Sequence, residues 1–308
     1  MSIRKVCAVA FAGLAIVAMS AHAHAQVEEL LSSYTGANGV AYMDPLKDAI
    51  GSNLSDGLYM SGHVPRAGFH ARLDVRAMVV KFDDDERTFM GVTEDYFPAE
   101  FSQEVPTVIG DEDAVAVTDP GTGAVFLFPG GFNIDNFALA VPQLTIGSVM
   151  GTEATIRYIA VDIGEESNDG GSSELGNLSL FGIGGRHSIS QYFPGLPVDA
   201  SAMFFYQRLQ IGDDDLLVAQ GQSFGIQVSK RFPIIEPYGG LAIDTFDMDV
   251  TYKTDVTGQE EEIDLDFDRE TTGHFTAGLG LHFGFLHLNG EVNIASQTSF
   301  AAGLGLGL

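Results

Sequence analysis

Arg186, His187 and Ser188 are the residues whose types come nearest to hydrolytic chemistry. A histidine base beside a serine hydroxyl is the pair that nucleophilic catalysis uses, provided that the two groups lie within hydrogen-bond reach. Neighbouring side chains on a strand point to opposite faces, so His187 and Ser188 point apart. Ser190 lies three residues from His187 and also points away from it. We therefore expect no catalytic site and no enzymatic activity.

A pair of histidines, His282 and His287, flanks the dipeptide Gly284-Phe285. A turn at that dipeptide would bring the two imidazoles together across neighbouring strands, near Asn289 and Glu291. A structural metal site needs three or four converging ligands, and this spacing supplies two histidines. Polar lining of an interior is therefore the preferred interpretation over a metal site, and no cofactor is expected.

Charged residues alternate with apolar ones between residues 67 and 82. His70, Arg72, Asp74 and Arg76 share one face, and the other face is apolar. Charges of both signs facing a lumen predict either a selectivity constriction or a self-paired seat for a plug. We prefer the seat because buried charges need partners. The candidate lumen-facing polar residues are His70, Arg72, Asp74, Arg76, His274, His282, His287, Asn289 and Glu291, and Arg157 and Arg208 are further candidates.

Acidic clusters form the third group. Asp83, Asp84 and Asp85 form one run, and Asp213, Asp214 and Asp215 form another. Clustered carboxylates suit hard cations such as Ca²⁺, but neither run has the D-x-[DN]-x-[DN]-G spacing of a calcium loop. Solvated charge is the preferred interpretation. The formal net charge of −27 argues against a nucleic-acid partner, which would require a basic surface.

The segment Thr298–Leu308 indicates which elements carry these groups. Its alternating residues are apolar on one face and almost all glycine or alanine on the other. Such a strand, ending the chain, predicts a transmembrane β-barrel whose last strand closes against its first. We expect it to lie against outer-membrane lipid and to be the segment that the barrel-assembly machinery recognises.

The same alternation recurs along the chain and predicts an all-β fold, an antiparallel barrel of about 12 strands, with a range of 10–14. The predicted strands are 67–82, 87–93, one within 113–128, 142–149, 152–163, 176–190, 198–211, 216–231, 234–253, 267–283, 286–296 and 298–308. The barrel as a whole is expected over 67–308. Residues 94–141 contain several prolines and are expected to form a long irregular insertion.

The N-terminal region differs from the barrel. Residues 1–25 have the charged start, apolar centre and Ala23-His24-Ala25 site of a cleaved signal peptide, which indicates export to the outer membrane of a Gram-negative bacterium. Residues 26–66 are expected to form a short helical plug or a periplasmic segment, and the alternative is a flexible N-terminal extension, because short helices are marginally stable alone. The dipeptide Asp44-Pro45 is typical of a helix start, and apolar residues follow it at helical spacing.

Several stretches resemble an uncharacterised family of bacterial outer-membrane barrels. They are Asn53–Tyr59, Lys81–Asp84, Val105–Gly110, Ala140–Leu144 and Gly151–Tyr158. The layout is more distantly similar to the long-chain fatty acid transporters, which implies an N-terminal plug inside the barrel and hydrophobic substrates. This chain is shorter than those transporters, has fewer expected strands than their fourteen, and ends in Leu308 where barrels usually end in Phe or Trp.

Two functions remain open from the sequence. The first is passive uptake of small hydrophobic molecules through a plugged or narrow lumen. The alternative is a non-transporting surface protein whose acidic extracellular loops bind ions, lipopolysaccharide or a partner.

Overall fold

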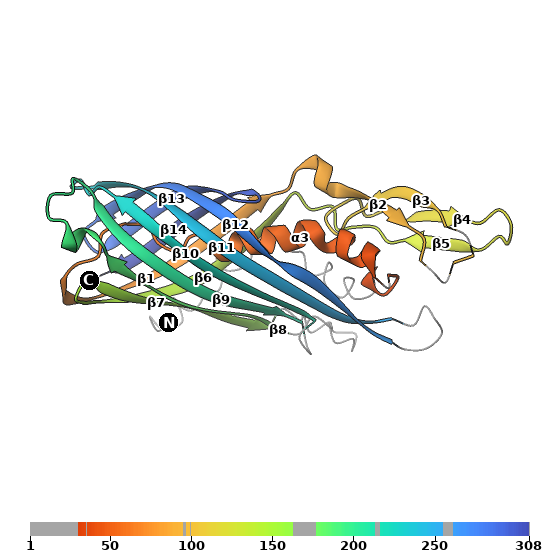
Figure 1. Ribbon diagram of the computed structural model, residues 1–308, viewed down its shortest axis with the longest axis horizontal. Coiled ribbons are helices and arrows are strands. Elements are labelled where there is room, and N and C mark those ends of the chain that lie inside the picture. The colour runs from red at the N-terminus through yellow and green to blue at the C-terminus, as the bar shows by residue number, and fades with distance from the viewer. Residues whose placement is uncertain are drawn as a thin grey trace, which may run out of the picture.

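Ten strands close into an antiparallel barrel, in the order β1-β14-β13-β12-β11-β10-β9-β8-β7-β6 (Figure 1). The structure is a computed structural model that describes residues 30–34, 36–94, 97–98, 100–162, 177–212, 216–254 and 261–307. The barrel strands are β1 (Ala67–Lys81), β6 (Asn136–Val149), β7 (Thr152–Asp162), β8 (Asn177–Ser188), β9 (Asp199–Ile211), β10 (Leu217–Ser229), β11 (Ile235–Thr254), β12 (Glu261–Phe283), β13 (Leu286–Ile294) and β14 (Thr298–Gly307). Among the described residues, no helix is long and apolar enough to cross a membrane.

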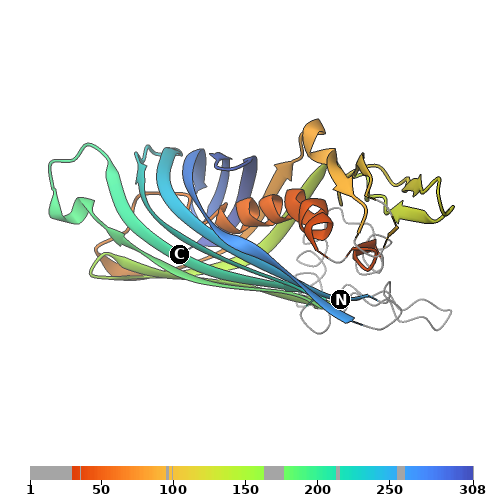
Figure 2. The same ribbon diagram turned by 45° about the vertical axis from the view of Figure 1, so that its right-hand side comes forward.

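The remaining elements gather at one end of the barrel. Two small sheets, β2 (Thr88–Val92) with β3 (Ser102–Pro106) and β4 (Val115–Thr118) with β5 (Val125–Phe128), lie beyond its mouth (Figures 1 and 2). Helix α3 (Ala37–Ser55) lies beside them and reaches into the barrel. The short helices η1 (Asp84–Arg87) and η2 (Ser190–Tyr192) lie in connections. We call the end with the small sheets the head end, and the opposite end the short-turn end.

The expected count of about twelve strands is not confirmed, because the barrel has ten. The ranges 87–93 and 113–128 form β2, β4 and β5, which are strands of four or five residues outside the barrel. A strand needs about 9–11 residues to cross a bilayer, so these cannot. The range 94–141, expected to be irregular, contains β3, β4, β5 and the beginning of β6.

The barrel is closed by the last strand. Strand β14 pairs with β1 on one side and with β13 on the other, so the sheet has no free edge. Phe300, Leu304 and Leu306 are exposed on the outside, as the alternation in the sequence predicts. Ser299 and Ala301 are buried on the inner side.

The two faces of β11 exchange their chemistry part of the way along the strand. Between Ile235 and Ile243 the exposed side chains are apolar, and Leu241 is 66 % exposed. Beyond Ile243 the exposed residues include Asp249, while Met248 on the inner side is fully buried. An apolar outside with a polar inside is typical of a membrane barrel, and the reverse is typical of a protein surface in water. The exchange therefore marks where β11 leaves the apolar band.

Strands β1 and β6 show the same exchange on their inner side. In β1 the inner residues are Arg72, Asp74 and Arg76, followed by the buried Met78 and Val80. Their cross-strand partners on β6 change in the same register, from Gln143 to Val141 and Leu139. The barrel thus has a polar lumen toward the short-turn end and an apolar core toward the head end.

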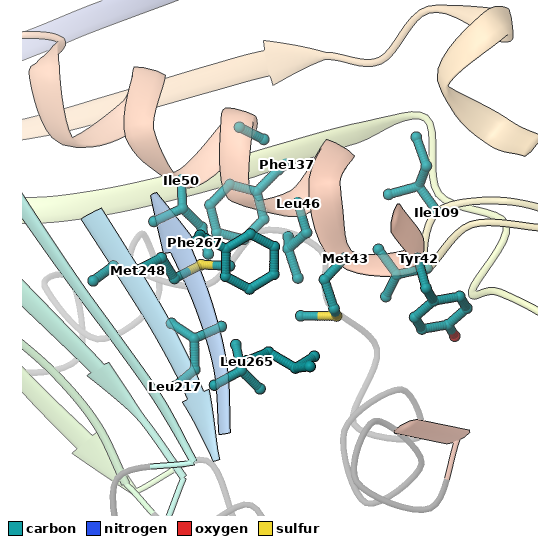
Figure 3. Close-up of a cluster of buried hydrophobic side chains, with 14 of the residues drawn as sticks. Tyr42, Met43, Leu46, Ile50, Ile109, Phe137, Leu217, Met248, Leu265 and Phe267 are labelled. Atoms are coloured by element: carbon teal, nitrogen blue, oxygen red, sulfur yellow. The ribbon is translucent and has the colours of Figure 1, made fainter. Parts of the chain in front are cut away.

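That apolar core surrounds α3. Figure 3 shows side chains of the helix packed against the outer parts of β11 and β12 and against the segment that carries Ile109. The labelled residues are Tyr42, Met43, Leu46, Ile50, Ile109, Phe137, Leu217, Met248, Leu265 and Phe267. We call α3, β2–β5 and the outer parts of β11 and β12 (246–254 and 261–270) the head.

Helix α3 begins earlier than the sequence predicts. The expected start was Asp44-Pro45, but the helix starts at Ala37 and Pro45 lies inside it. An interior proline costs about 3 kcal/mol of helix stability. Tyr42 and Met43, which precede it, are fully buried in the head core. Burying two large side chains contributes about 3–6 kcal/mol, which is enough to hold the first two turns.

The glycines of β14 leave room for the charged residues of β1. A methyl group added at Gly305 would overlap Asp74 Oδ1, and one at Gly303 would overlap Asn289 Oδ1 and lie 2.8 Å from Arg76 Nη1. The glycine side of β14 therefore leaves the space inside the barrel that Asp74 and Arg76 occupy.

We predict that Gly305→Ala destabilises the barrel by about 1–3 kcal/mol, because a new methyl group must push Asp74 aside. Unfolding in urea, followed by the heat-modifiable mobility of the folded barrel in gels, measures this. Gly290→Ala is the matched control, because a methyl group at Gly290 meets no atom within 4 Å. Equal midpoints for the two variants would contradict the role of Gly305.

Candidate functional site

A segment of the chain passes through the barrel lumen. After α3 ends at Ser55, residues 56–66 run from the head end to the start of β1 at the short-turn end without forming a helix or strand (Figures 1 and 2). Leu58, Tyr59, Met60 and Ser61 are all buried. We call residues 54–64 the lumen segment. The segment is not paired with a strand, so its buried backbone N–H and C=O groups need other hydrogen-bond partners.

Side chains of the barrel wall supply those partners. Arg157 donates to the carbonyl oxygens of Asp56 and Gly57, and Gln143 donates to Leu58 O at 3.1 Å. The other bonds to segment carbonyls are Gln207 to Leu54, Gln227 to Tyr59 at 2.6 Å and Arg186 to Ser61. These donors come from β6, β7, β8, β9 and β10.

Backbone N–H groups of the same segment are bound by side chains of β13 and β10. Gly57 N donates to Glu291 Oε1 at 2.9 Å, and Gly62 N donates to Ser229 Oγ at 2.9 Å. A Cβ atom at Gly62 would lie 2.7 Å from Asp199 O and 2.8 Å from Ser229 N. The segment therefore touches the wall so closely at Gly62 that only glycine fits.

Two arginines also stack on aromatic rings. The guanidinium of Arg186 lies 5.2 Å from the ring centroid of Tyr59, and that of Arg157 lies 5.3 Å from that of Phe205. The rings of Tyr59 and Phe205 lie 6.0 Å apart in an edge-on arrangement. Cation–π contacts away from water contribute about 2 kcal/mol each. The contact between Arg186 and Tyr59 holds an aromatic side chain of the lumen segment, and the hydrogen bonds hold the backbone of the segment.

The polar residues predicted to face the lumen lie around this segment and pair among themselves. Arg72 Nε lies 2.9 Å from Asp74 Oδ2, and Arg76 Nη1 donates to Asn289 Oδ1 at 2.9 Å. The Tyr238 hydroxyl donates to Glu291 Oε2 at 2.6 Å. In the same region His274 Nδ1 lies 2.7 Å from Asp244 Oδ2, and His70 Nε2 lies 2.6 Å from Glu153 Oε1. His282 and His287 lie at the short-turn end.

The residues that hold the lumen segment are mostly ones that the sequence did not single out. Gln143, Gln207 and Gln227 look like ordinary polar positions of amphipathic strands. Of the two further arginines, Arg157 is buried in the lumen. Arg208 pairs in register with Phe181, which is 44 % exposed, so it belongs to the outer face. The signal available in the sequence was the two-residue spacing of Glu153, Thr155 and Arg157, which puts them on one face.

The predicted acidic loops show no converged cation site. Asp83, Asp84 and Asp85 are exposed around η1, where Glu86 caps the backbone N–H of Asp83. Asp213, Asp214 and Asp215 lie outside the described residues. Within the part of the chain that the structure describes, no three His, Cys, Asp or Glu side chains are placed to hold a metal ion together.

A buried carboxylate in the head also has a structural role. The Thr122 hydroxyl and the backbone N–H of Gly121 hold the pKa of Asp119 below its usual range. These bonds close the turn between β4 and β5.

His187 and Ser188 have separate partners. His187 Nδ1 lies 2.7 Å from Thr152 Oγ1 and its Nε2 lies 2.9 Å from the Tyr192 hydroxyl, whereas Ser188 Oγ lies 3.3 Å from Ser190 Oγ. Ser188 lines a cavity of about 420 Å³ at the short-turn end, together with Pro65 of the chain leaving the lumen. The absence of enzymatic activity stays a prediction.

The chain was compared with protein families and with known proteins. A family model described as a family of unknown function (DUF6588) matches residues 3–308. The curated proteins contain no match. The resemblance to the long-chain fatty acid transporters is not shown by these comparisons.

Among solved structures, the chain is similar to the β domain of the Bordetella autotransporter BrkA, at 12 % identity, 79 % of this chain, 100 % of that chain and a TM-score of 0.34. It is also similar to Salmonella typhi OmpF, at 10 % identity, 78 % and 97 % coverage and a TM-score of 0.22. The Ralstonia pickettii toluene transporter TbuX matches at 9 % identity, 89 % and 94 % coverage and a TM-score of 0.20. Scores this low carry no argument about function.

We predict that Arg157→Met weakens the lumen segment's seat and lowers the stability of the folded barrel by about 3–5 kcal/mol, because the carbonyls of Asp56 and Gly57 lose their donor. Guanidinium unfolding in detergent micelles measures the change. The matched control is Arg269→Met on the head, where an exposed Arg269–Asp247 pair at 2.8 Å contributes about 0–1 kcal/mol. A small effect at Arg157 would mean that the segment is held by other contacts.

Proposed function

Because the chain belongs to a family of unknown function, DUF6588, we propose its function from its own structure. We propose that it is an outer-membrane barrel kept closed by its lumen segment, and that it acts as a surface protein through its head rather than as a pore. The observation that carries this proposal is the set of wall side chains bound to the backbone of residues 54–62.

The outer surface of the barrel supports the membrane assignment. Large apolar side chains are exposed on each of the ten barrel strands, including Phe69, Ile156, Phe224, Leu241 and Phe300. An outward apolar band is what lipid covers. Bacterial barrels have short periplasmic turns and longer extracellular loops, so the short-turn end is assigned to the periplasm and the head to the outside. The signal peptide, residues 1–25, lies outside the described residues and stays an expectation.

A closed lumen follows from the number of bonds that opening would break together. Moving the segment out would strip donors from consecutive carbonyls and leave Arg157 and Arg186 without their backbone acceptors. Leaving a buried polar group unpaired costs about 1–3 kcal/mol, and more for a charged one. Water entering the lumen would offset part of this, but thermal motion alone would open the barrel rarely.

The head carries the surface that a surface protein would use. On β11 and β12, Asp249 is opposite Asp266, and Thr251 donates to Asp264 Oδ1 at 2.8 Å. Like charges opposite each other destabilise a strand pair, so a cation at this surface would relieve their repulsion. This favours divalent ions or a basic partner over direct contact with anionic lipopolysaccharide.

Passive uptake of small hydrophobic molecules is the second candidate. It is favoured by the empty space beside the end of the lumen segment. The cavity of about 420 Å³ beside His63, Val64 and Pro65 gives the segment space to move toward the periplasm. Uptake requires that the segment moves.

We predict that the refolded protein shows no steady conductance in a planar bilayer, because the lumen segment fills the path. Arg157→Met should raise the frequency of brief openings by about tenfold or more, consistent with the loss of over 1.4 kcal/mol of seat energy. A steady conductance of the unmodified protein would contradict the closed-lumen proposal.

A disulfide lock separates the two candidates. Ser61 Oγ and Ser229 Oγ lie 3.5 Å apart, and Cys7, the single cysteine of the chain, lies in the expected signal peptide. We predict that Ser61→Cys with Ser229→Cys behaves the same when oxidised and when reduced, in an assay that follows a small hydrophobic dye entering outer-membrane vesicles. The two single variants are the controls. Entry that stops on oxidation and returns on reduction would establish uptake and a moving plug.

A further inference from the structure

Four histidines line one cavity at the periplasmic mouth of the barrel. The cavity measures about 230 Å³, and its lining includes His63, His70, His282, His287 and Arg72. His63 belongs to the end of the lumen segment, and the others come from β1, β12 and β13. Ser61 and Arg186, which hold the lower end of the lumen segment, also line this cavity. His282 and His287 take no part in those bonds, so the closed lumen does not account for them.

Two of these histidines form an unusually close pair. His282 and His287 are cross-strand partners on either side of the turn at Gly284-Phe285. Their Nδ1 atoms lie 2.7 Å apart, and their ring planes are inclined at 73°. One hydrogen at most fits between two nitrogens at that distance, so at least one Nδ1 presents a lone pair to the other.

A carboxylate lies behind the pair. Glu236 Oε2 is 2.8 Å from His282 Nε2, on the far side of the ring from His287. Glu236 is itself held by Ser229 Oγ at 2.7 Å and by Arg231 Nε at 3.0 Å. The contact is a charge contact without hydrogen-bond geometry. A carboxylate at this distance still favours hydrogen on Nε2 over a lone pair there, which leaves the lone pair on Nδ1. Histidines that bind metals are commonly oriented by a carboxylate in this way.

We propose that His282 and His287 bind a first-row transition-metal ion of tetragonal preference, Cu²⁺ or Ni²⁺, through their Nδ1 atoms. Metal–imidazole bonds measure about 2.0–2.1 Å. Two such ligands at a right angle lie about 2.9 Å apart, and at the tetrahedral angle about 3.4 Å apart. The observed 2.7 Å is close to the right-angle value, which suits Cu²⁺ or Ni²⁺ better than Zn²⁺.

The surroundings tolerate the added charge. The three arginines of the cavity are each paired with a carboxylate, Arg72 with Asp74 at 2.9 Å, Arg186 with Glu153 at 2.6 Å and Arg231 with Glu236 at 3.0 Å. Since no third His, Cys, Asp or Glu converges with the pair among the described residues, water fills the remaining positions. His70 lines the same cavity, and its Nδ1 has no hydrogen-bond partner in the described part of the chain. Of the residues that line the cavity, His70 is the one whose side chain is best suited to supply a third ligand.

The test titrates the refolded, tag-free full-length barrel with CuCl₂ and with NiCl₂ against a chromophoric chelator. We expect one ion per barrel, and binding weakened at least tenfold in His287→Gln and in His282→Gln. His187→Gln is the matched control, because His187 lies outside this cavity and binds Thr152 and Tyr192. Cu²⁺ electron paramagnetic resonance should show two nitrogen ligands in the wild-type protein and one in each variant.

Heat-modifiable gel mobility identifies any variant that has not folded, and the spectrum of the wild-type protein then decides. Binding that is unchanged in both folded variants, or lost equally in His187→Gln, would overturn the proposal. A wild-type spectrum without nitrogen ligands would overturn it as well, and would leave the pair as two imidazoles sharing a hydrogen.

Discussion

The structure depends on an extended backbone placed inside a closed barrel. Every strand of the barrel is hydrogen-bonded to a strand on each side, so no strand edge is free to pair with the backbone of residues 56–66. Buried carbonyl and N–H groups without partners would exclude such a segment. Glutamine and arginine side chains from five strands solve the problem by reaching inward to successive carbonyls. The polar side chains of the lumen and the backbone of the lumen segment therefore depend on each other, since each supplies the hydrogen-bond partners of the other.

The second constraint is the environment on the outside. Over most of the barrel, apolar groups face out and polar groups face the lumen segment. In the outer parts of β11 and β12 the faces exchange and an apolar core closes around α3, which agrees with the proposal that lipid covers only the first region. Helix α3 connects these two regions, because its buried side chains anchor the upper end of the lumen segment in the head. A plug anchored at both ends, by apolar packing above and by hydrogen bonds below, is difficult to displace as a unit.

The two ends of the barrel differ in their chemistry. The head has carboxylates opposite each other on β11 and β12, and the short-turn end gathers histidines around a cavity. The lumen segment separates the two, so a ligand at one end has no direct path to the other. This arrangement is why we propose a surface protein and not a pore.

The sequence by itself determined the closed barrel and the inward face of its strands. Alternation with period two is a local property, and it placed Phe300 and Leu304 outside and the glycines of β14 inside. The alternation could not determine the number of barrel strands, because β2, β4 and β5 alternate in the same way. Prolines and loops surround these segments, so their true length could not be read from the sequence. The meeting of His282 and His287 was also predicted from the sequence, because the short turn at Gly284-Phe285 sets the register of β12 and β13 locally. Only the tertiary structure decided which side chains hold the lumen segment. Gln143, Gln207 and Gln227 lie on three different strands and come together because the barrel closes around that segment.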